Sequence, residues 1–183
     1  MKILALSGSL RTGSYNTKLL LAAAAVAADG VEITLYEGLK EIPPYDADDD
    51  LPGHQPVAVR RLKRAIGEAD AVLVATPEYN HSIPGVLKNA LDWVSRPLAE
   101  SPALNKPVAV ISSSTGMFGG VWAAAETRKV LGALGARVLE TTVTLPKAHD
   151  RLADGVDDAL SAELRSVVHA LAAAVESRLA AAA

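Results

Sequence analysis

The sequence predicts an α/β fold in which helices cover both faces of an open parallel sheet. Residues 71–76 and 107–112 are apolar almost throughout, which is typical of parallel strands buried on both faces. These two runs and three further strand-like segments alternate with stretches whose apolar residues recur at helical spacing. No internal repeat interrupts this order, so one continuous sheet is the simplest arrangement.

The composition limits the kind of protein this can be. We expect one domain spanning residues 1–183, with 50% hydrophobic and 21% charged residues. The net charge of −3 and the lack of a long basic run argue against nucleic-acid and membrane-surface partners. The absence of cysteine excludes disulfides, thiolate metal sites and cysteine nucleophiles. Without a signal-peptide pattern or an apolar run of about 18 residues, a cytoplasmic location is expected.

The first third of the chain predicts two strands and one helix. Residues 2–6 are mostly apolar and run into a loop of Gly, Ser and Thr, after which helical spacing extends over residues 16–28. Asp29-Gly30 is expected to end this helix. Residues 31–36 alternate apolar and polar side chains, which predicts a second strand at or near an edge of the sheet.

A long polar loop over residues 38–56 follows the second strand. A connection of this length is either functional, part of an interface, or a solvated excursion, and the sequence leaves these alternatives open. Its four aspartates lack the spacing of an EF-hand, so we expect an acidic surface loop and no Ca²⁺ site. Residues 57–68 then predict an amphipathic helix with a basic, solvated face.

The rest of the chain continues the alternation. Ser82 and Pro84 mark the start of a helix that ends near Ser95, where Pro97 stops it. Gly135 is the expected cap of the following helix. These further elements are a strand at 107–112, a helix at 121–134, a fifth strand at 137–143 and a closing helix at 160–179.

The loop after the first strand is a candidate phosphate site. Free N–H groups and the dipole at a helix N-terminus favour an anion, and Arg11 adds a charged fork of donors. The loop lacks the Lys of a Walker A motif and departs from the dinucleotide fingerprint, which favours a single terminal phosphate monoester. An ordinary polar connection without a ligand is the alternative. The side-chain donors are Ser7, Ser9, Ser14, Asn16 and Thr17.

Two further loops should converge on the first, because ligands bind at the carboxyl ends of strands in open parallel sheets. Residues 77–85 provide Tyr79, whose flat ring can stack on a planar group. Residues 113–120 provide hydroxyls and backbone N–H groups for its edge. A planar heterocycle with a phosphorylated tail would suit this combination, and flavin mononucleotide (FMN) is the obvious candidate.

The same loops resemble a known family, the flavodoxin-like NAD(P)H-dependent FMN reductases, which includes quinone, azo-dye and chromate reductases. The resemblance covers about residues 1–145 and implies a five-stranded sheet of order 2-1-3-4-5. The segments that carry it are Gly8-Ser9-Leu10-Arg11-x-Gly13-Ser14-x-Asn16, Pro44-Tyr45-Asp46, Pro77-Glu78-Tyr79-Asn80-x-Ser82-x-Pro84-Gly85-x-Leu87-Lys88-Asn89-Ala90-x-Asp92-Trp93 and Ser114-x-Gly116-x-x-Gly119-Gly120.

The resemblance implies a set of FMN-binding residues. The first loop would bind the phosphate, residues 77–80 would line the isoalloxazine with Tyr79 against the ring, and residues 113–120 would cover the pyrimidine side. It also implies a homodimer or homotetramer with flavin sites near the interface. The implied cofactor-binding residues are Ser9, Arg11, Ser14, Tyr15, Asn16, Pro77, Glu78, Tyr79, Asn80, Ser113, Ser114, Thr115, Gly116 and Gly119.

The expected activity is electron transfer from NADPH or NADH through FMN to a quinone or similar acceptor, by a ping-pong cycle. FMN supplies the chemistry, so no catalytic side chain is needed; Tyr79, Asn80 and Gly116 would support the ring. Trp122 departs from the family pattern, because relatives often carry Arg near this position. The bulky indole could narrow the pocket or join an interface.

Other functions fit less well. The alternative is a non-enzymatic electron carrier or flavin-binding regulatory module, although a carrier is usually more acidic than −3. A serine hydrolase is disfavoured because Ser112–Thr115 lack the G-x-S-x-G elbow. The four histidines lack ligand spacing for zinc, and His81 is more simply a loop residue than an acid.

Overall fold

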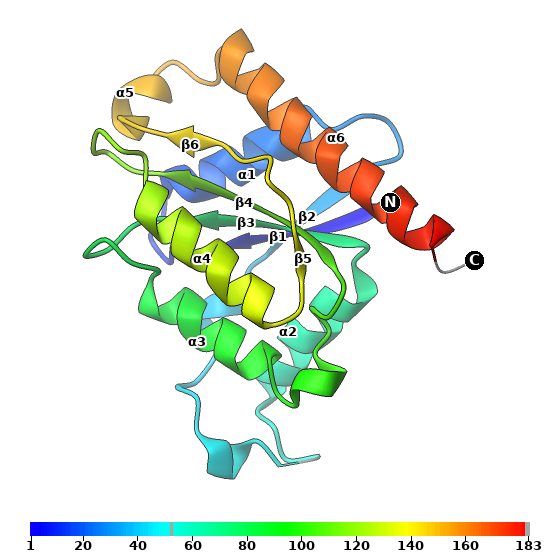
Figure 1. Cartoon of the computed structure of the whole chain (residues 1–183). Helices are drawn as coiled ribbons and strands as arrows, with labels where there is room; N and C mark the ends of the chain where they lie inside the picture. Colours follow the sequence, from blue (N-terminus) through cyan, green and yellow to red (C-terminus); the bar gives the residue numbers. More distant parts are fainter. Residues whose placement is uncertain (52, 182–183) are drawn as a thin grey trace.

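A computed structural model describes residues 1–51 and 53–181, and therefore omits Pro52 of the long loop and the last two alanines. Strands and helices alternate along the chain from β1 to β5, and β6, α5 and α6 complete the chain (Figure 1). The strands are β1 Lys2–Ser7, β2 Glu32–Tyr36, β3 Ala71–Thr76, β4 Pro107–Ser113, β5 Arg137–Val138 and β6 Thr144–Leu145. The helices are α1 Tyr15–Ala25, α2 Val57–Glu68, α3 Gly85–Val94, α4 Val121–Ala133, α5 Ala148–Arg151 and α6 Asp158–Ala180, with 3₁₀ turns η1 Gly38–Glu41, η2 Ala47–Asp49 and η3 Leu98–Glu100.

The strands form a parallel sheet of order β2-β1-β3-β4-β5, which confirms the predicted fold class and order. β1 and β3 lie in the centre, and β2 is an edge strand, as its alternating pattern predicted. The β3 residues are all buried, in agreement with the expectation for a strand covered on both faces. The flavodoxin-like strand order therefore places the loops after β1, β3 and β4 at one edge of the sheet.

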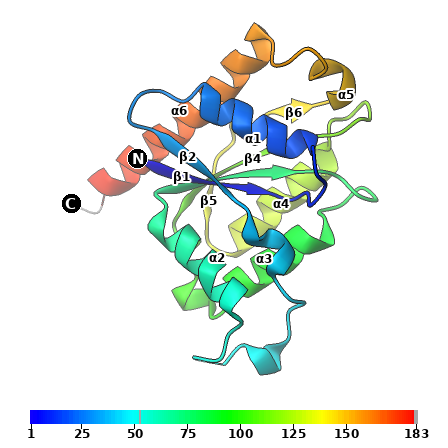
Figure 2. The same ribbon diagram turned by 180° about the vertical axis from the view of Figure 1, so that it is seen from behind.

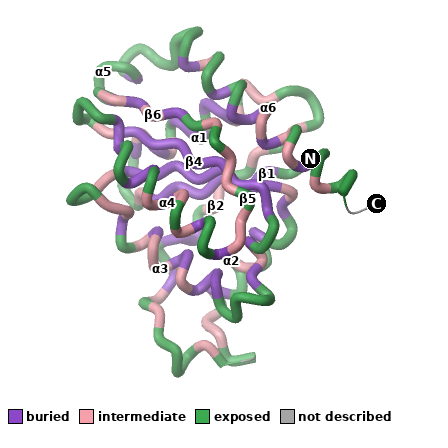
Figure 3. Tube along the Cα trace, viewed as in Figure 1, coloured by how far each residue is buried: buried purple, intermediate pink, exposed green. Residues whose placement is uncertain are grey.

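Alternate residues of the strands belong to two separate cores. Ile3, Ala5 and Leu73 contribute to the core beneath α1 and α6, whereas Leu4 and Val74 face α2, α3 and α4. Figure 2 shows α1 and α6 on one face of the sheet, and Figure 3 shows the buried strands between exposed outer helix faces. Side chains of successive strand residues point to opposite faces, so each strand helps to fill both cores.

The expected fifth strand over residues 137–143 is interrupted in the structure. β5 and β6 both pair with β4, through Val108 with Val138 and Ser113 with Leu145. Val108 and Ser113 are five residues apart on β4, whereas their partners Val138 and Leu145 are seven residues apart. The segment between β5 and β6 therefore has two extra residues that cannot pair with β4. The Thr142 hydroxyl donates to Val110 O in place of a backbone N–H. β6 and the short helix α5 were not predicted from the sequence.

The long loop between β2 and α2 is attached to α3 at its first half. The Trp93 indole N–H donates to Pro43 O at 2.9 Å, and the Asn89 amide donates to the same oxygen at 2.8 Å. Asn89 Oδ1 accepts from the Tyr45 N–H, and the Tyr45 ring lies edge-on to Trp93 at 4.8 Å. The 3₁₀ turn η2 extends away from the rest of the fold (Figure 1). The Pro44-Tyr45-Asp46 segment is thus built onto the helix that follows the second site loop.

Candidate cofactor site

One cavity of about 410 Å³ lies where the loops after β1, β3 and β4 meet. This size is within the range of small-molecule sites, roughly 300–1,000 Å³. Asn80, Gly116 and Gly119, which the sequence also suggested, do not line it. The lining residues are Ser9, Arg11, Ser14, Tyr15, Asn16, Pro77, Glu78, Tyr79, Ser113, Ser114 and Thr115.

The first loop is organised by the N-terminus of α1. Ser14 is buried and is the N-cap residue, with its hydroxyl accepting from the Thr17 N–H at 3.4 Å. The Thr17 hydroxyl in turn bonds Ser7 Oγ at 2.9 Å. Gly13 has a φ of 72°, a conformation that glycine adopts without steric cost. These contacts hold the free N–H groups of the first helical turn next to the cavity.

Positive charge gathers around Tyr15 at the start of α1, where Arg11 lines the cavity and Lys18 lies outside its lining. The Arg11 guanidinium lies 5.1 Å from the centroid of the Tyr15 ring, and the Lys18 ammonium lies 5.5 Å from it. Both distances are within the range of cation–π attraction. Tyr15 therefore brings together two cations beside the α1 N-terminus, and the sequence had not indicated Lys18. This arrangement suits a dianionic phosphate.

Asn16 joins the first loop to the third. Its side chain is buried, and its amide makes two hydrogen bonds with one residue: Nδ2 donates to Ser113 O at 3.1 Å, and Oδ1 accepts from Ser113 N at 3.0 Å. The Asn16 amide therefore pairs with the backbone of Ser113 as a neighbouring strand would, and it joins two residues that line the cavity. A phosphate-binding role had been expected for Asn16, and the side chain is already engaged with Ser113.

Two buried hydroxyls at the end of β4 have no partner among the residues that the structure describes. They are Ser112 Oγ and Ser113 Oγ, and Ser113 lines the cavity. A buried polar group without a hydrogen bond is unfavourable, so a hydroxyl beside a cavity indicates a ligand or solvent partner. The donor set of the three loops therefore fits FMN: cations and helix N–H groups at one end, hydroxyls along an edge, and Tyr79 as a flat surface.

The third loop is fixed to β6 and α5 by backbone hydrogen bonds. Ser114 donates to Leu145 O at 3.1 Å and accepts from Ala148 N at 2.9 Å, while Lys147 N donates to Gly116 O at 2.9 Å. A Cβ atom at Gly119, where φ is 63°, would lie 2.7–2.9 Å from atoms of residues 144–146. Gly119 thus lets the loop pack closely against β6, which explains why it does not line the cavity.

The second loop is fixed to α4 by carboxylates. Glu78 Oε2 accepts from the N–H groups of Trp122 at 3.0 Å and Ala123 at 3.1 Å, in the first turn of the helix. From α4, Glu126 Oε2 accepts from the Ser82 hydroxyl and from the Ile83 N–H. The hydrogen bond from the Ser82 hydroxyl and, to a smaller extent, the one from the Ile83 N–H lower the pKa of Glu126 below its ordinary value. Glu126 was not recognised from the sequence, where it follows no motif.

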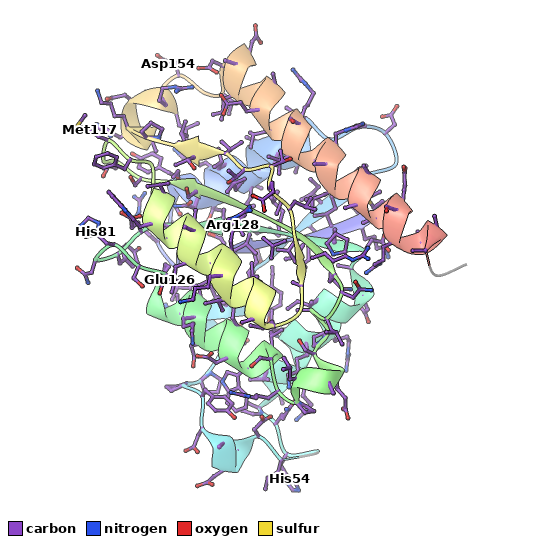
Figure 4. All side chains as sticks on the ribbon, in the orientation of Figure 1. His54, His81, Met117, Glu126, Arg128 and Asp154 are labelled. Carbon is purple, nitrogen blue, oxygen red and sulfur yellow. The ribbon has the colours of Figure 1, made fainter. Side chains whose placement is uncertain are left out.

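Aromatic side chains surround the outer end of this loop. The His81 and Trp122 rings lie edge to face at 4.9 Å, and Phe118 lies 5.0 Å from Trp122. Figure 4 places His81 and Met117 at the tips of the second and third loops, on the same side of the molecule. His81 Nδ1 is 3.7 Å from Glu78 Oε1, too long for a hydrogen bond. Trp122 therefore contacts both loops and lies outside the cavity lining.

The described residues contain neither a metal-binding cluster nor a membrane-spanning helix. No cluster of three or more His, Asp or Glu side chains has the geometry of a metal site. Among residues 1–51 and 53–181, every helix is too short or too polar to cross a lipid bilayer.

Comparison with known proteins gave consistent similarities. The sequence model of a family described as NADPH-dependent FMN reductase matches residues 1–150. The chain is 46% identical over 131 residues to an NAD(P)H-dependent FMN reductase of Pseudomonas aeruginosa, covering 72% of this chain and 69% of the relative. It is 39% identical over 139 residues to a quinone reductase of Escherichia coli, covering 76% and 73%.

A solved structure is similar over nearly the whole chain. It is FerB, a flavoenzyme NAD(P)H:(acceptor) oxidoreductase from Paracoccus denitrificans, with a TM-score of 0.86 and 33% identity. The similarity covers 97% of this chain and 98% of that one. A flavodoxin of Pseudomonas aeruginosa, at 20% identity and a TM-score of 0.57, shares the fold.

Proposed function

This chain belongs to the NADPH-dependent FMN reductase family, and we propose that it binds FMN in the three-loop cavity and transfers electrons from NADPH or NADH to a quinone or similar acceptor. The lining of this cavity carries the assignment. The loop after β1 provides a helix N-terminus and Arg11, and the end of β4 provides the Ser113 hydroxyl, which has no partner among the described residues. These groups match the phosphate and the polar edge of one flavin.

The proposed roles follow from the positions of the residues. Arg11, the Ser9 and Ser14 hydroxyls and the N–H groups of the first α1 turn would hold the phosphate. Tyr79 would lie against the ring, and Ser113 and the loop that follows it would donate to the polar edge of the ring. The side chain of Asn16 would act indirectly, since its bonds with Ser113 set the separation of two loops.

Bound FMN would supply the redox chemistry, by accepting a hydride from reduced nicotinamide and passing two electrons to the acceptor. The chain would orient the two planar groups, exclude water beneath the ring and neutralise charge with N–H dipoles. Donor and acceptor would occupy the same exposed face of the ring in turn. This is the basis of a ping-pong cycle.

The kinetic part has a direct test. Initial rates measured at several quinone concentrations against NADPH should give parallel double-reciprocal lines, because the first product leaves before the second substrate binds. Intersecting lines would exclude the ping-pong cycle and leave the assignment of the cavity intact. The ratio of kcat/KM for NADPH and NADH, from the same experiment, determines the preferred donor.

An electron carrier or flavin-binding regulatory module is the alternative within the same fold. It would bind FMN and show almost no NAD(P)H oxidation with a quinone. The proposal further includes a single FMN-binding domain, a cytoplasmic location and a homodimer or homotetramer. Sedimentation equilibrium of the FMN-loaded protein would test the oligomer, and a monomer at micromolar concentration would contradict it.

A further inference from the structure

The second loop contains a tight turn at Asn80 and His81. The N–H of Tyr79 donates to Ser82 O at 3.2 Å, and the N–H of Ser82 donates to Tyr79 O at 3.1 Å. Both central residues have positive φ, 53° at Asn80 and 59° at His81. Positive φ at both positions is the geometry of a type I′ turn, for which Asn-Gly is the preferred sequence.

His81 is a less favourable residue than glycine for this backbone. A side chain with a Cβ atom is strained at positive φ, and such a residue persists only where its surroundings fix the conformation. Packing around the turn is sparse: the Tyr79 residue is 54% exposed and the His81 side chain is 78% exposed. The edge-to-face contact of His81 with Trp122 is the aromatic support. The other support for this backbone conformation comes from hydrogen bonds to groups outside the turn.

Glu126 supplies them on the far side of the turn. Its Oε2 atom accepts from the Ser82 hydroxyl at 2.5 Å and from the Ile83 N–H at 3.3 Å. These donors are the last residue of the turn and the residue after it. Figure 4 shows Glu126 on the side of α4 that faces α3, below the loop that carries His81.

Glu78 attaches the residues before the turn to α4, and here the loop provides the carboxylate while the helix provides the donors. Glu78 extends from the loop to α4, where its Oε2 atom accepts from two N–H groups of the first turn. The loop is therefore joined to one helix at both ends, by one carboxylate from each partner. Between the two attachments lies Tyr79, which lines the cavity.

We propose that Glu126 is a positioning residue for the flavin site: its carboxylate holds the Asn80–His81 turn in its strained conformation and so keeps Tyr79 at the cavity wall. The inference rests on the proposed function for its link to FMN. It assigns a part in cofactor affinity to a residue that does not itself line the cavity. In a chain without this carboxylate, the turn would populate other conformations and the site would be partly disassembled.

Hydrogen exchange on the FMN-free chain tests the structural half. Glu126→Ala removes the carboxylate and raises helix propensity, so α4 should fold. We expect exchange at the amides of Tyr79 and Ser82, which bond to each other across the turn, to accelerate by roughly tenfold or more, because a turn that is mostly formed becomes mostly open. Glu163→Ala, on an exposed position of α6 on the other face of the sheet, is the matched control and should leave these amides unchanged.

FMN titration tests the functional half. If the competent turn falls to between about a third and a tenth of the population, the Kd for FMN rises by threefold to tenfold. His81→Gly should reverse both effects in the Glu126→Ala background, because glycine adopts positive φ without strain. A merely structural role of Glu126 in α4 would not be rescued by this substitution.

The outcomes separate the two proposals. Unchanged exchange and unchanged Kd in Glu126→Ala would overturn the inference, as would effects that His81→Gly fails to reverse. A wild-type chain that binds no FMN would overturn the proposed function and the link to FMN. The exchange comparison would still decide, in that case, whether Glu126 holds the turn.

Discussion

The loops at 77–85 and 113–120 border the same cavity but are held by different chemistry. The loop at 113–120 is joined to residues 145–148 by backbone hydrogen bonds, which most side-chain substitutions leave in place. The loop at 77–85 depends on the carboxylates of Glu78 and Glu126. The first kind of support is broken by a misplaced Cβ atom, whereas the second is broken by loss of a charge. The loop that carries Tyr79 is therefore the adjustable wall of the site.

The largest expected effect is on the backbone-held loop. Gly119→Ala would place a Cβ atom 2.7–2.9 Å from atoms of residues 144–146, at a φ of 63°. The β6 backbone cannot move away without breaking its pairing, and alanine is strained at this φ. We therefore expect the free energy of unfolding to fall by about 2–3 kcal/mol. Urea denaturation monitored by far-UV circular dichroism would measure it.

The matched control is Gly132→Ala in α4. Among the described residues, no atom outside the neighbouring turns of α4 lies within 4 Å of its added Cβ, and alanine favours a helix interior, so stability should rise by up to about 1 kcal/mol. Equal losses at both glycines would show that the close approach of β6 does not hold the loop.

The contact between the first and third loops is the next to break. Asn16→Ala leaves the buried Ser113 N–H and carbonyl without their side-chain partner, at an expected cost of about 1–3 kcal/mol, and should also weaken FMN binding. Ser113→Ala removes a hydroxyl that has no partner within the described residues, so stability should hold while FMN affinity falls. Denaturation and FMN titration of the two variants would distinguish them. A stability loss in Ser113→Ala would contradict this division.

Loss of the Glu78 carboxylate should have a smaller effect. Glu78→Ala removes the hydrogen bonds at the start of α4, and loss of a helix cap costs about 1 kcal/mol. Asp157→Ala is the comparison, since Asp157 caps α6 through the Leu160 N–H and does not line the cavity. Both variants should lose similar stability in thermal unfolding, and Glu78→Ala alone should weaken FMN binding. Similar FMN affinities would argue that the second loop is not held through Glu78.

The smallest effect is a pH dependence of the carboxylate-held loop. The Ser82 hydroxyl and the Ile83 N–H lower the pKa of Glu126 in the folded state below the ordinary value of 4.5. The ionised group therefore contributes stability above about pH 4.5, and this contribution is lost as the pH falls through the lower folded-state pKa. The difference in unfolding free energy between wild type and Glu126→Gln should narrow from pH 6 to about pH 3. A constant difference would mean that ionisation of Glu126 does not support the loop.

Most of the fold could be predicted because its signals are local. Residues 71–76 and 57–68 form β3 and α2 with the expected bounds, since a doubly buried strand and an amphipathic helix each have a distinct pattern. The stripe of α6 is likewise buried at Leu160, Leu164 and Leu171. The interruption between β5 and β6 could not be predicted, because it depends on how many residues must fit beside β4.

The candidate site shows the same division. Loops at the ends of β1, β3 and β4 were predicted to meet because strand order determines their position, and their residues do line one cavity. The partners of Asn16 and Glu78 could not be predicted, since each bonds a residue more than 40 positions away. Glu126 shows no local signal at all. Its importance depends on its hydrogen bonds to the residues that follow His81, 43 and 44 positions away in the sequence.

The central claim is that the three-loop cavity binds a flavin that reduced nicotinamide can reach. The most direct measurement is the visible absorption spectrum of the protein after incubation with FMN and removal of free flavin, followed by anaerobic addition of NADPH or NADH. We expect the protein to retain the flavin bands, and we expect these bands to bleach within seconds of the addition. A colourless protein would contradict the assignment of the cavity, and retained bands that do not bleach would contradict the reductase activity.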